Sequence, residues 1–444
     1  MTETPICGFL RDYASKNAVR LHMPGHKGKC HTGSELYDIT EIKGADALYE
    51  CGGIIRRSEE IAAGLFGSYA SFYSTEGSSQ CIRAMIYLSL IHGKIHGERP
   101  VILASRNAHK SFVLACALLD VDIAWLNDEE DEYSLCRCLV TPDSVKSAIK
   151  KYRPFAVYIT SPDYLGNMLD VKSFAEAAHS FDIPLLVDNA HGAYLRFLPR
   201  SLHPMDAGAD MCCDSAHKTL PVLTGGAYLH IGGENAGKYA EKAKNAMALF
   251  GSTSPSYLIL QSLDLCNNYL SEGYRGNLAK RIEEIDKLKA EISEEGIRVL
   301  RSDPLKLTVC SHGIDLSEKL REYEIECEYE DPDFTVMMFT PDNAEDDLLK
   351  VKNALSENAR ILKKRDSRPK LKFREHLRKM SVRDAIFSES ENIDAERSAG
   401  RTLAFPSIGC PPAVSPVVSG EIITESDVEI FEYYGIERVD VVKL

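Results

Sequence analysis

Short apolar runs alternate with amphipathic helical patterns over much of the chain, from about residue 56 to residue 250. The helical patterns fall at 79–91, 142–150 and 171–181, and the strand-like runs fall at 70–73, 101–104, 156–159, 185–187 and 227–230. This alternation is typical of βαβ units, whose strands form a largely parallel sheet. It predicts an α/β fold in which ligands bind at the carboxyl ends of the strands.

The chain of 444 residues is too long for one simple core, so several domains are expected. A charged helix is predicted at 277–294, and a smaller α+β region with strands near 305–309 and 334–338 follows it. The tail contains a helical stretch around 373–387 and a proline-bearing segment at 405–418. We therefore predict an N-terminal segment (1–55), a major domain (56–275), a small α+β domain (276–360) and a C-terminal domain (361–444).

The composition excludes several classes of partner. The net charge of -14 argues against nucleic acid, because phosphate binding needs a basic protein face. No apolar stretch approaches the roughly 20 residues that span a bilayer, and the first residues lack the basic and apolar regions of a signal peptide. We expect a cytoplasmic protein that does not enter a membrane and whose thirteen cysteines stay reduced.

The cysteines do not have the spacing of a metal site. One residue separates Cys136 from Cys138, and Cys212 adjoins Cys213, whereas zinc ligands are commonly separated by two residues. Cys212 and Cys213 also lie where a buried strand is expected. We therefore predict core cysteines and no metal.

Two polar motifs that follow apolar runs contain the most chemically specific residues of the chain. Asp188-Asn189-Ala190-His191-Gly192 closes the run 183–187, and Ser215-Ala216-His217-Lys218 follows, so that Lys218 lies 30 residues after Asp188. Many enzymes that use pyridoxal phosphate (PLP) present an aspartate at a strand end to the pyridine nitrogen and hold the cofactor through a lysine. The two motifs in this order therefore predict a PLP site.

A third motif provides groups that can bind a phosphate. Ser74-Thr75-Glu76-Gly77-Ser78-Ser79 lies between a predicted strand and a predicted helix. Backbone amides and hydroxyls at a helix start bind phosphate well, because the first amides of a helix have no partner within it. Gly77, Ser78 and Ser79 are the predicted phosphate-binding residues of this loop.

Together with these motifs, the chain resembles the Orn/Lys/Arg decarboxylase family in its short form, which has no wing domain before the first motif. The resemblance covers nearly the whole length and rests on six segments in order: Leu21–Gly28, Asp38–Glu41, Arg106–Ser111, Asp188–Ala193, Ser215–Lys218 and Ser252–Tyr257. It implies PLP fold type I, the aspartate aminotransferase fold, with a shared active site in a homodimer or higher homo-oligomer.

The resemblance also implies a role for each matching residue. Lys218 would hold PLP as an internal Schiff base, and Asp188 would keep the pyridine nitrogen protonated. His109 would stack on the cofactor ring, which makes Lys218, Asp188 and His109 the predicted catalytic residues. His191 would lie near the ring oxygen.

Further matching residues would bind the cofactor phosphate. Ser215 and His217 would do so within one subunit, and Ser252 and Thr253 would reach the phosphate of a neighbouring subunit. A monomer is then expected to be inactive.

Several segments depart from the family pattern. Glu76 precedes Gly77 where the family usually has asparagine, and Gln80 follows Ser79 where it has glycine. The usual Asp-Glu-Ala-His-Gly-Ala-His is here Asp188 to Tyr194, with Asn189 in place of the glutamate. A stretch that commonly reads Asp-Asp-Leu-His becomes Asp46-Ala47-Leu48-Tyr49, followed by Glu50, on the substrate side of the site.

These residues predict decarboxylation of arginine, lysine or ornithine to agmatine, cadaverine or putrescine, as in polyamine biosynthesis. The distal cation of the substrate should meet a carboxylate, for which Asp46 and Glu50 are candidates. Two alternatives remain open. One is another fold type I PLP enzyme, either an aminotransferase or a carbon–sulfur lyase, and the other is a catalytically silent relative that regulates polyamine supply.

Overall fold

The structure is a computed structural model that describes residues 2–50, 52–126, 134–359, 376–406 and 408–443. The chain groups into two compact units, each made of two segments: residues 1–94 with 171–278, and residues 95–170 with 279–444. The predicted domain boundaries stay predictions, and the one between 360 and 361 lies outside the described residues.

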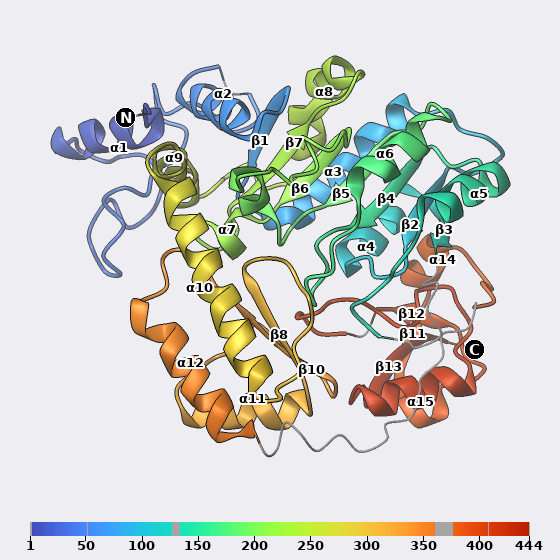
Figure 1. Cartoon of the computed structure of the whole chain (residues 1–444). Coiled ribbons are helices and arrows are strands. Elements are labelled where there is room, and N and C mark those ends of the chain that lie inside the picture. The colour runs from blue at the N-terminus through green and yellow to red at the C-terminus, as the bar shows by residue number, and fades with distance from the viewer. Residues whose placement is uncertain (1, 51, 127–133, 360–375, 407, 444) are drawn as a thin grey trace. The chain divides into compact units, whose positions relative to one another are not determined.

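The first unit contains four strands of the seven-stranded main sheet, in the order β1-β7-β6-β5 (Figure 1). Their bounds are β1 Ala70–Ser74, β7 Ala227–Ile231, β6 Met211–Asp214 and β5 Leu185–Asp188. β5 and β6 are parallel, whereas β7 is antiparallel to β6 and to β1. The chain between β6 and β7 contains only the short helix α7 (Ala216–Thr219), which is too short for a parallel crossover.

Helices of the first unit pack on these strands and on one another. Their bounds are α1 Pro5–Ser15, α2 Ile54–Phe66, α3 Gly77–His92, α6 Val171–His179, η1 Ala193–Phe197, α8 Ala236–Ala248 and α9 Tyr257–Ser271. α3 packs against β6 and β7, and α2 packs against β1 and α9. The predicted helices at 79–91 and 171–181 are confirmed to within two residues at each end.

The second unit contains the remaining strands of the main sheet in the order β4-β2-β3, all parallel: β4 Ala156–Thr160, β2 Val101–Ser105 and β3 Asp122–Leu126. α4 (Lys110–Leu119) follows β2, and α5 (Pro142–Tyr152) precedes β4. α5 begins where the Thr141 side chain and Ser144 form a reciprocal capping box. β3 was not among the predicted strands, because its sequence begins with Asp122 and carries no β-branched residue except Ile123.

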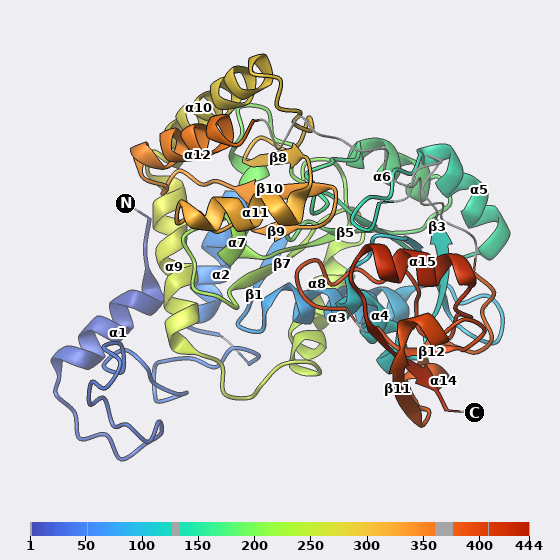
Figure 2. The same ribbon diagram turned by 90° about the horizontal axis from the view of Figure 1, so that it is seen from below.

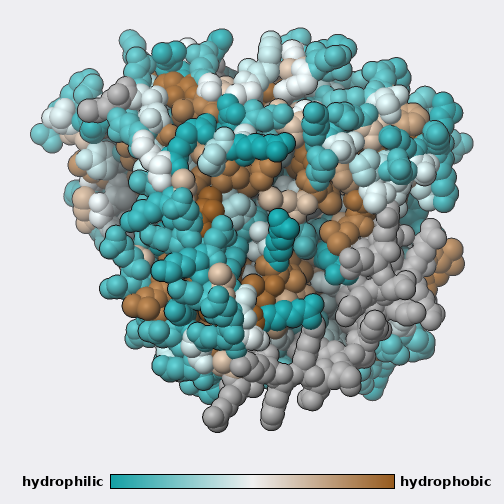
Figure 3. All heavy atoms as spheres, viewed as in Figure 1, coloured by the Kyte–Doolittle hydropathy of each residue, from teal (hydrophilic) through white to brown (hydrophobic). Residues whose placement is uncertain are grey.

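A small α+β part of the second unit matches the prediction from sequence. Its strands are β8 Lys306–Cys310, β9 Tyr329–Glu330 and β10 Phe334–Met338, and its helices are α10 Tyr274–Glu294, α11 Gly313–Glu322 and α12 Glu345–Glu357. α10 and α12 lie side by side (Figures 1 and 2). Two ion pairs join them, Lys280 with Glu345 and Lys352 with Glu291. Hydrophilic side chains cover most of the region of these two helices in Figure 3.

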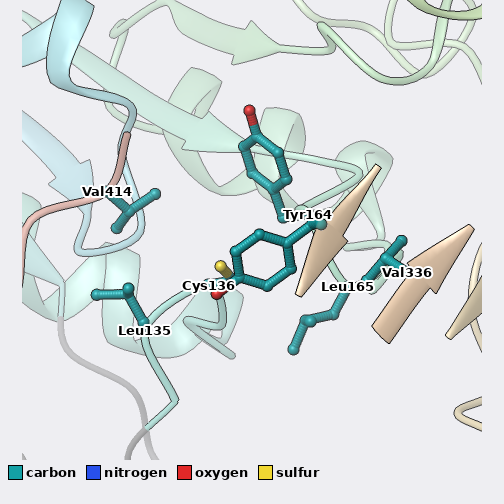
Figure 4. Close-up of a cluster of buried hydrophobic side chains, with 7 residues drawn as sticks. Leu135, Cys136, Tyr164, Leu165, Val336 and Val414 are labelled. Atoms are coloured by element: carbon teal, nitrogen blue, oxygen red, sulfur yellow. The ribbon is translucent and has the colours of Figure 1, made fainter. Parts of the chain in front are cut away.

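A buried cluster of this unit joins β10 to the segment after β4. It contains Tyr164 and Leu165 from that segment, Val336 from β10, and Leu135 and Cys136, together with Tyr329 and Val414 (Figure 4). Burial raises the pKa of the Cys136 thiol far above its usual value, as expected for a cysteine that packs as a small apolar side chain.

The C-terminal part contains a second small sheet that the sequence did not predict. Its elements are α14 Val382–Phe387, β11 Ser390–Asp394, η2 Ala395–Arg397, β12 Leu403–Phe405, α15 Glu425–Tyr433 and β13 Arg438–Val442, with the strand order β11-β13-β12. β11 reads Ser-Glu-Asn-Ile-Asp and is mostly exposed, so it lacks the alternating apolar pattern of a strand. Over the described residues, no helix is long and apolar enough to cross a membrane.

Candidate active site

The motifs that predicted a PLP site meet at one edge of the sheet in the first unit. β5 ends at Asp188, β6 ends at Asp214, and the parallel register places Asp188 opposite Cys213. Because the two strands are parallel, their carboxyl ends lie at the same edge, where open α/β sheets bind ligands. His191 follows the first strand, and Lys218 lies in α7 after the second.

Lys218 and His191 contact each other directly. Lys218 Nζ lies 2.8 Å from His191 Nε2, although the two residues are 27 positions apart. His191 is buried and Lys218 is half-buried, so the amine is held at the boundary between the protein interior and accessible space. An amine that contacts an imidazole can exchange a proton with it, which is the arrangement that activates a lysine nucleophile.

Asp188 is a buried carboxylate with a fixed orientation. Asp188 is only 3% exposed, and its Oδ1 accepts a hydrogen bond from the Ala190 N–H at 3.2 Å. Cys213 Sγ lies 3.6 Å from the same oxygen. A carboxylate buried at a strand end is suited to pair with one cationic ring nitrogen.

The predicted phosphate residues converge from distant parts of the chain. Ser215 Oγ donates to Ser78 Oγ at 2.8 Å, and Ser78 lies in the first turn of α3. Gly77 begins that helix at φ 69°, a left-handed conformation that favours glycine, and a Cβ built there meets no atom within 4 Å. The start of α3, two hydroxyls and open space above Gly77 therefore fit a phosphate group.

Gln80 supports this loop, a role that the sequence did not indicate. It is fully buried, and Gln80 Oε1 accepts the Ser74 hydroxyl at 2.6 Å. Gln80 Nε2 donates to Tyr49 Oη at 2.9 Å and to the Met247 carbonyl at 2.8 Å. The preceding Glu76 is exposed, so this acid does not occupy the interior beside the proposed phosphate position.

His217 is fixed by the backbone. His217 Nδ1 lies 3.0 Å from the Gly226 carbonyl, so this nitrogen carries the proton and donates it. Ser252 and Thr253 are exposed in the segment before α9, where Ser252 Oγ accepts the Ser254 N–H at 3.1 Å. Their exposure is compatible with contact to a neighbouring subunit, which stays a prediction.

The two predicted substrate carboxylates lie in different surroundings. Asp46 accepts backbone N–H groups from the four residues Ala47, Gly52, Gly53 and Ile55 at 2.8 to 3.1 Å. Burial alone would raise the pKa of Asp46, but these four bonds outweigh it and lower the pKa. Asp46 thus organises its loop with both oxygens, whereas Glu50 is exposed.

His109 belongs to the second unit. It follows β2 and caps α4, where His109 Nδ1 accepts the Ser111 N–H at 3.1 Å. Arg106, in the same motif, makes two bonds with Glu421, at 2.7 and 2.6 Å. The predicted stacking of His109 on the cofactor ring stays a proposal.

Sequence reasoning missed a second carboxylate at the same sheet edge. Asp214 is fully buried, as are His203 and His230, which lie 2.9 and 3.3 Å from Asp214 Oδ2 through their Nε2 atoms. The sequence did contain a signal for this carboxylate, because Asp214 ends the apolar run Met211-Cys212-Cys213 and directly precedes Ser215. The residue types in this cluster could hold a metal ion.

Comparison with known proteins places the chain among amino acid decarboxylases. A family model described as Orn/Lys/Arg decarboxylase, major domain, matches residues 4–311. The arginine decarboxylase of Bacillus subtilis (strain 168) is 30% identical over 463 aligned residues, covering 96% of this chain and 92% of that protein.

Solved structures share the fold. A lysine decarboxylase of Francisella novicida aligns with a TM-score of 0.77 at 17% identity, covering 99% of this chain and 81% of that chain. A serine palmitoyltransferase of Sphingomonas wittichii aligns with a TM-score of 0.57 at 10% identity, covering 81% of this chain and 84% of that chain. These alignments confirm the predicted PLP fold type I, and the family match confirms the predicted family. The chain is therefore an enzyme of the Orn/Lys/Arg decarboxylase family, whose members are PLP-dependent carboxy-lyases.

Proposed function

We propose that this protein removes the α-carboxyl group of arginine, lysine or ornithine as carbon dioxide and releases the corresponding amine. The observation that carries the proposal is the contact between Lys218 Nζ and His191 Nε2 at 2.8 Å, at the edge where Ser215 meets Ser78. The arginine decarboxylase of Bacillus subtilis covers nearly the whole chain, which makes arginine the first substrate to test.

The residues present fit PLP. Lys218 would bind it covalently, and Asp188 would pair with its ring nitrogen. The phosphate would lie among Gly77, Ser78, Ser79, Ser215 and His217, with His191 near the ring oxygen. When bound, PLP supplies an electron-accepting ring that stabilises the negative charge left on Cα as carbon dioxide departs.

The side chains of the protein would hold and move protons around that ring. Asp188, fixed by the Ala190 N–H, keeps a proton at the ring nitrogen. His191 Nε2 takes a proton from the Lys218 ammonium and leaves the amine free to attack. His109, from the second unit, is the proposed residue that stacks on the ring and orients it.

For the distal cation of the substrate, Glu50 is the better supported of the two proposed carboxylates. Both oxygens of Asp46 accept hydrogen bonds from backbone amides, and the distal cation of the substrate would have to compete with these amides. Glu50 lies four residues further along the same segment and is exposed. Its effect should appear in KM for the basic amino acid.

We also propose that the protein acts as a homodimer or higher homo-oligomer in the cytoplasm. Ser252 and Thr253 are exposed and precede α9, which supports their predicted reach toward the cofactor phosphate of a neighbouring subunit. Buried free cysteines such as Cys212 and Cys213 agree with a reducing compartment.

The test is carbon dioxide release from purified, PLP-loaded protein given arginine, lysine and ornithine separately, with the amine identified by mass. Release from one substrate is expected, and Lys218→Ala should abolish it. Lys238→Ala is the matched control, because Lys238 is an exposed lysine of α8 whose ammonium donates to Asn235 Oδ1 at 3.1 Å, away from the proposed site residues.

Two results would favour the alternatives. Amino-group transfer or sulfur release from another amino acid would indicate an aminotransferase or a carbon–sulfur lyase. PLP binding with no turnover of any substrate would indicate a silent relative that regulates polyamine supply.

A further inference from the structure

A chain of buried polar side chains crosses the four strands of the first unit in their order in the sheet. Ser71 on β1 and His230 on β7 are cross-strand neighbours, and Ser71 Oγ lies 2.7 Å from His230 Nδ1. His230 Nε2 lies 3.3 Å from Asp214 Oδ2 at the end of β6. Asn189, directly after β5, donates from Nδ2 to Asp214 Oδ1 at 2.7 Å. We call Ser71, His230, Asp214, Asn189 and His203 the buried polar chain.

The surroundings of this chain are dry. Asp214, His203, His230 and Asn189 are 0% exposed. The ring of Phe66 packs on both imidazoles, with centroids 4.4 Å from His230 and 5.6 Å from His203. In such surroundings a hydrogen bond is strong, so the hydrogen bonds of the buried polar chain define its geometry closely.

The hydrogen bonds assign most of the protons. The Met205 N–H donates to His203 Nδ1 at 3.3 Å, so His203 Nε2 carries the ring proton and donates it to Asp214 Oδ2 at 2.9 Å. Burial alone would raise the pKa of Asp214, but the two histidines outweigh it and hold the pKa below the usual range. Asp214 is thus an ionised acceptor.

This proton assignment decides between a metal site and a hydrogen-bonded network. A histidine that binds a metal through Nε2 must present that nitrogen without a proton. His203 Nε2 carries its proton because Nδ1 accepts from the backbone. The cluster of His203, Asp214 and His230 is therefore a hydrogen-bonded network.

The bond between Asn189 and Asp214 joins the two segments that carry the proposed cofactor residues. Asn189 directly follows Asp188, and Asp214 directly precedes Ser215. A Cβ at Gly192 would overlap Asn189 Oδ1, so the neighbouring turn also confines the asparagine side chain. A change in this one bond would shift a proposed ring-nitrogen partner relative to a proposed phosphate ligand.

We propose that Asn189 and Asp214 are positioning residues of the PLP site: their hydrogen bond sets the spacing between Asp188 on one strand end and Ser215 with Lys218 on the next. The proposal rests on the proposed function, because it assumes that PLP binds at this edge. Neither residue touches the cofactor in this assignment, and both act through their neighbours in sequence.

The chemistry of the pair permits a test by exchange. Asn189→Asp places a second carboxylate against Asp214, where the bond now measures 2.7 Å, so the two acids repel or share a proton. Adding Asp214→Asn restores one donor facing one acceptor. In that double variant the asparagine oxygen can still accept from His203, because His203 and Asn189 contact different oxygens of residue 214.

The measurements are the PLP dissociation constant of the apo-protein, its melting temperature, and the near-visible absorption of the lysine-bound cofactor. Asn189→Asp should weaken PLP binding by about tenfold or more, the effect of one buried hydrogen bond replaced by repulsion. The exchange variant, Asn189→Asp with Asp214→Asn, should restore the dissociation constant and the absorption to within about threefold of the wild type.

A matched control separates positioning from general stability. Asn267 is another fully buried asparagine of the first unit, on α9, and Asn267 Nδ2 donates to Tyr73 Oη at 2.8 Å. Asn267→Asp should lower the melting temperature while the folded protein keeps its PLP affinity. If Asn189→Asp behaves in the same way, the proposal is overturned.

The remaining outcomes are equally decisive. If Asn189→Asp does not fold, the exchange variant decides: wild-type PLP affinity supports the proposal, and weak affinity refutes it. Wild-type protein that binds no PLP would refute the proposed function itself, whereas wild-type binding that Asn189→Asp leaves unchanged would refute the positioning role alone.

Discussion

Replacing Glu421 by glutamine should destabilise the second unit by about 3 kcal/mol, the lower end of the cost of breaking a buried ion pair. Arg106 donates from Nη1 to Glu421 Oε1 at 2.7 Å and from Nη2 to Oε2 at 2.6 Å. Their side chains are only 8% and 7% exposed, so water cannot replace the lost contact. Glutamine keeps one acceptor but turns an amide toward the guanidinium, and the Val418 N–H, now 2.7 Å from Oε2, loses its charged partner.

Urea unfolding followed by tryptophan fluorescence measures this effect at the site itself. The chain has one tryptophan, Trp125, and Arg106 Cζ lies 4.9 Å from the centre of its ring. A double-mutant cycle with Arg106→Met should give a coupling energy of about 2 to 3 kcal/mol, because removing both charges leaves neither one unpaired. We expect the double variant to be more stable than Glu421→Gln alone.

An exposed pair in the same unit provides the control. Arg438 Nη1 lies 2.6 Å from Asp394 Oδ1, but both side chains are about half exposed, at 53% and 51%. Asp394→Asn should therefore cost less than about 1 kcal/mol. A loss below about 0.5 kcal/mol for Glu421→Gln, equal to that of the control, would refute the reasoning from burial.

Three further changes have defined outcomes. Burial raises the pKa of Asp331 from 3.8 to about 6, so its contribution to stability is present below about pH 4 and is lost as the pH rises to about 6. In urea unfolding measured at a series of pH values, Asp331→Asn should reduce that loss of stability by up to about 3 kcal/mol. Ser215→Ala and Ser78→Ala should each weaken PLP binding, and the double variant should lose less than the sum in a PLP titration, because the two hydroxyls contact each other. Gly251→Ala should lower the melting temperature by several degrees, since its Cβ would overlap the Gln80 side chain; an unchanged melting temperature would contradict that packing.

The sequence predicted those parts of the site that depend on local order along the chain. Asp188 could be placed because it ends a continuous apolar run, and Lys218 because it follows a second run at a spacing typical of PLP enzymes. The strands at 185–187 and 227–230 were confirmed to within one residue at each end. The contact between Ser78 and Ser215 agrees with their separate prediction as phosphate residues, although the distance between them in sequence gives no hint of it.

The buried polar chain could not be predicted, because it depends on the order of strands in space. β1 lies beside β7 although 152 residues lie between Ser74 and Ala227, and only this neighbour relation brings Ser71 to His230. His203 reaches Asp214 from an irregular segment before β6, where no periodic pattern exists. From the sequence alone, His230 is an isolated polar residue in the apolar strand Ala227–Ile231, because its hydrogen-bond partners come from other strands.

The departures from the family pattern bear on whether the protein is a working enzyme or a silent relative. Tyr49 stands where the family commonly has histidine, and Gln80 stands where it has glycine. Gln80 Nε2 donates to Tyr49 Oη at 2.9 Å. Asn189 stands where the family has glutamate, and it donates to the ionised Asp214 at 2.7 Å.

A chain that had lost selection on its cofactor site would accumulate mismatches that leave buried groups unpaired, at a cost of about 1 to 3 kcal/mol each. Here Tyr49 Oη accepts a hydrogen bond from Gln80 Nε2, and Asn189 Nδ2 donates one to Asp214, although Asn189 Oδ1 has no hydrogen-bond partner among the described residues. A glutamate at 189 would bring a second acid toward Asp214, so the asparagine suits this chain better than the family residue would. The two bonds from Gln80 to Tyr49 and from Asn189 to Asp214 therefore favour a working site over a silent relative, and Tyr49 and Glu50 are the altered positions at which a change of substrate is expected.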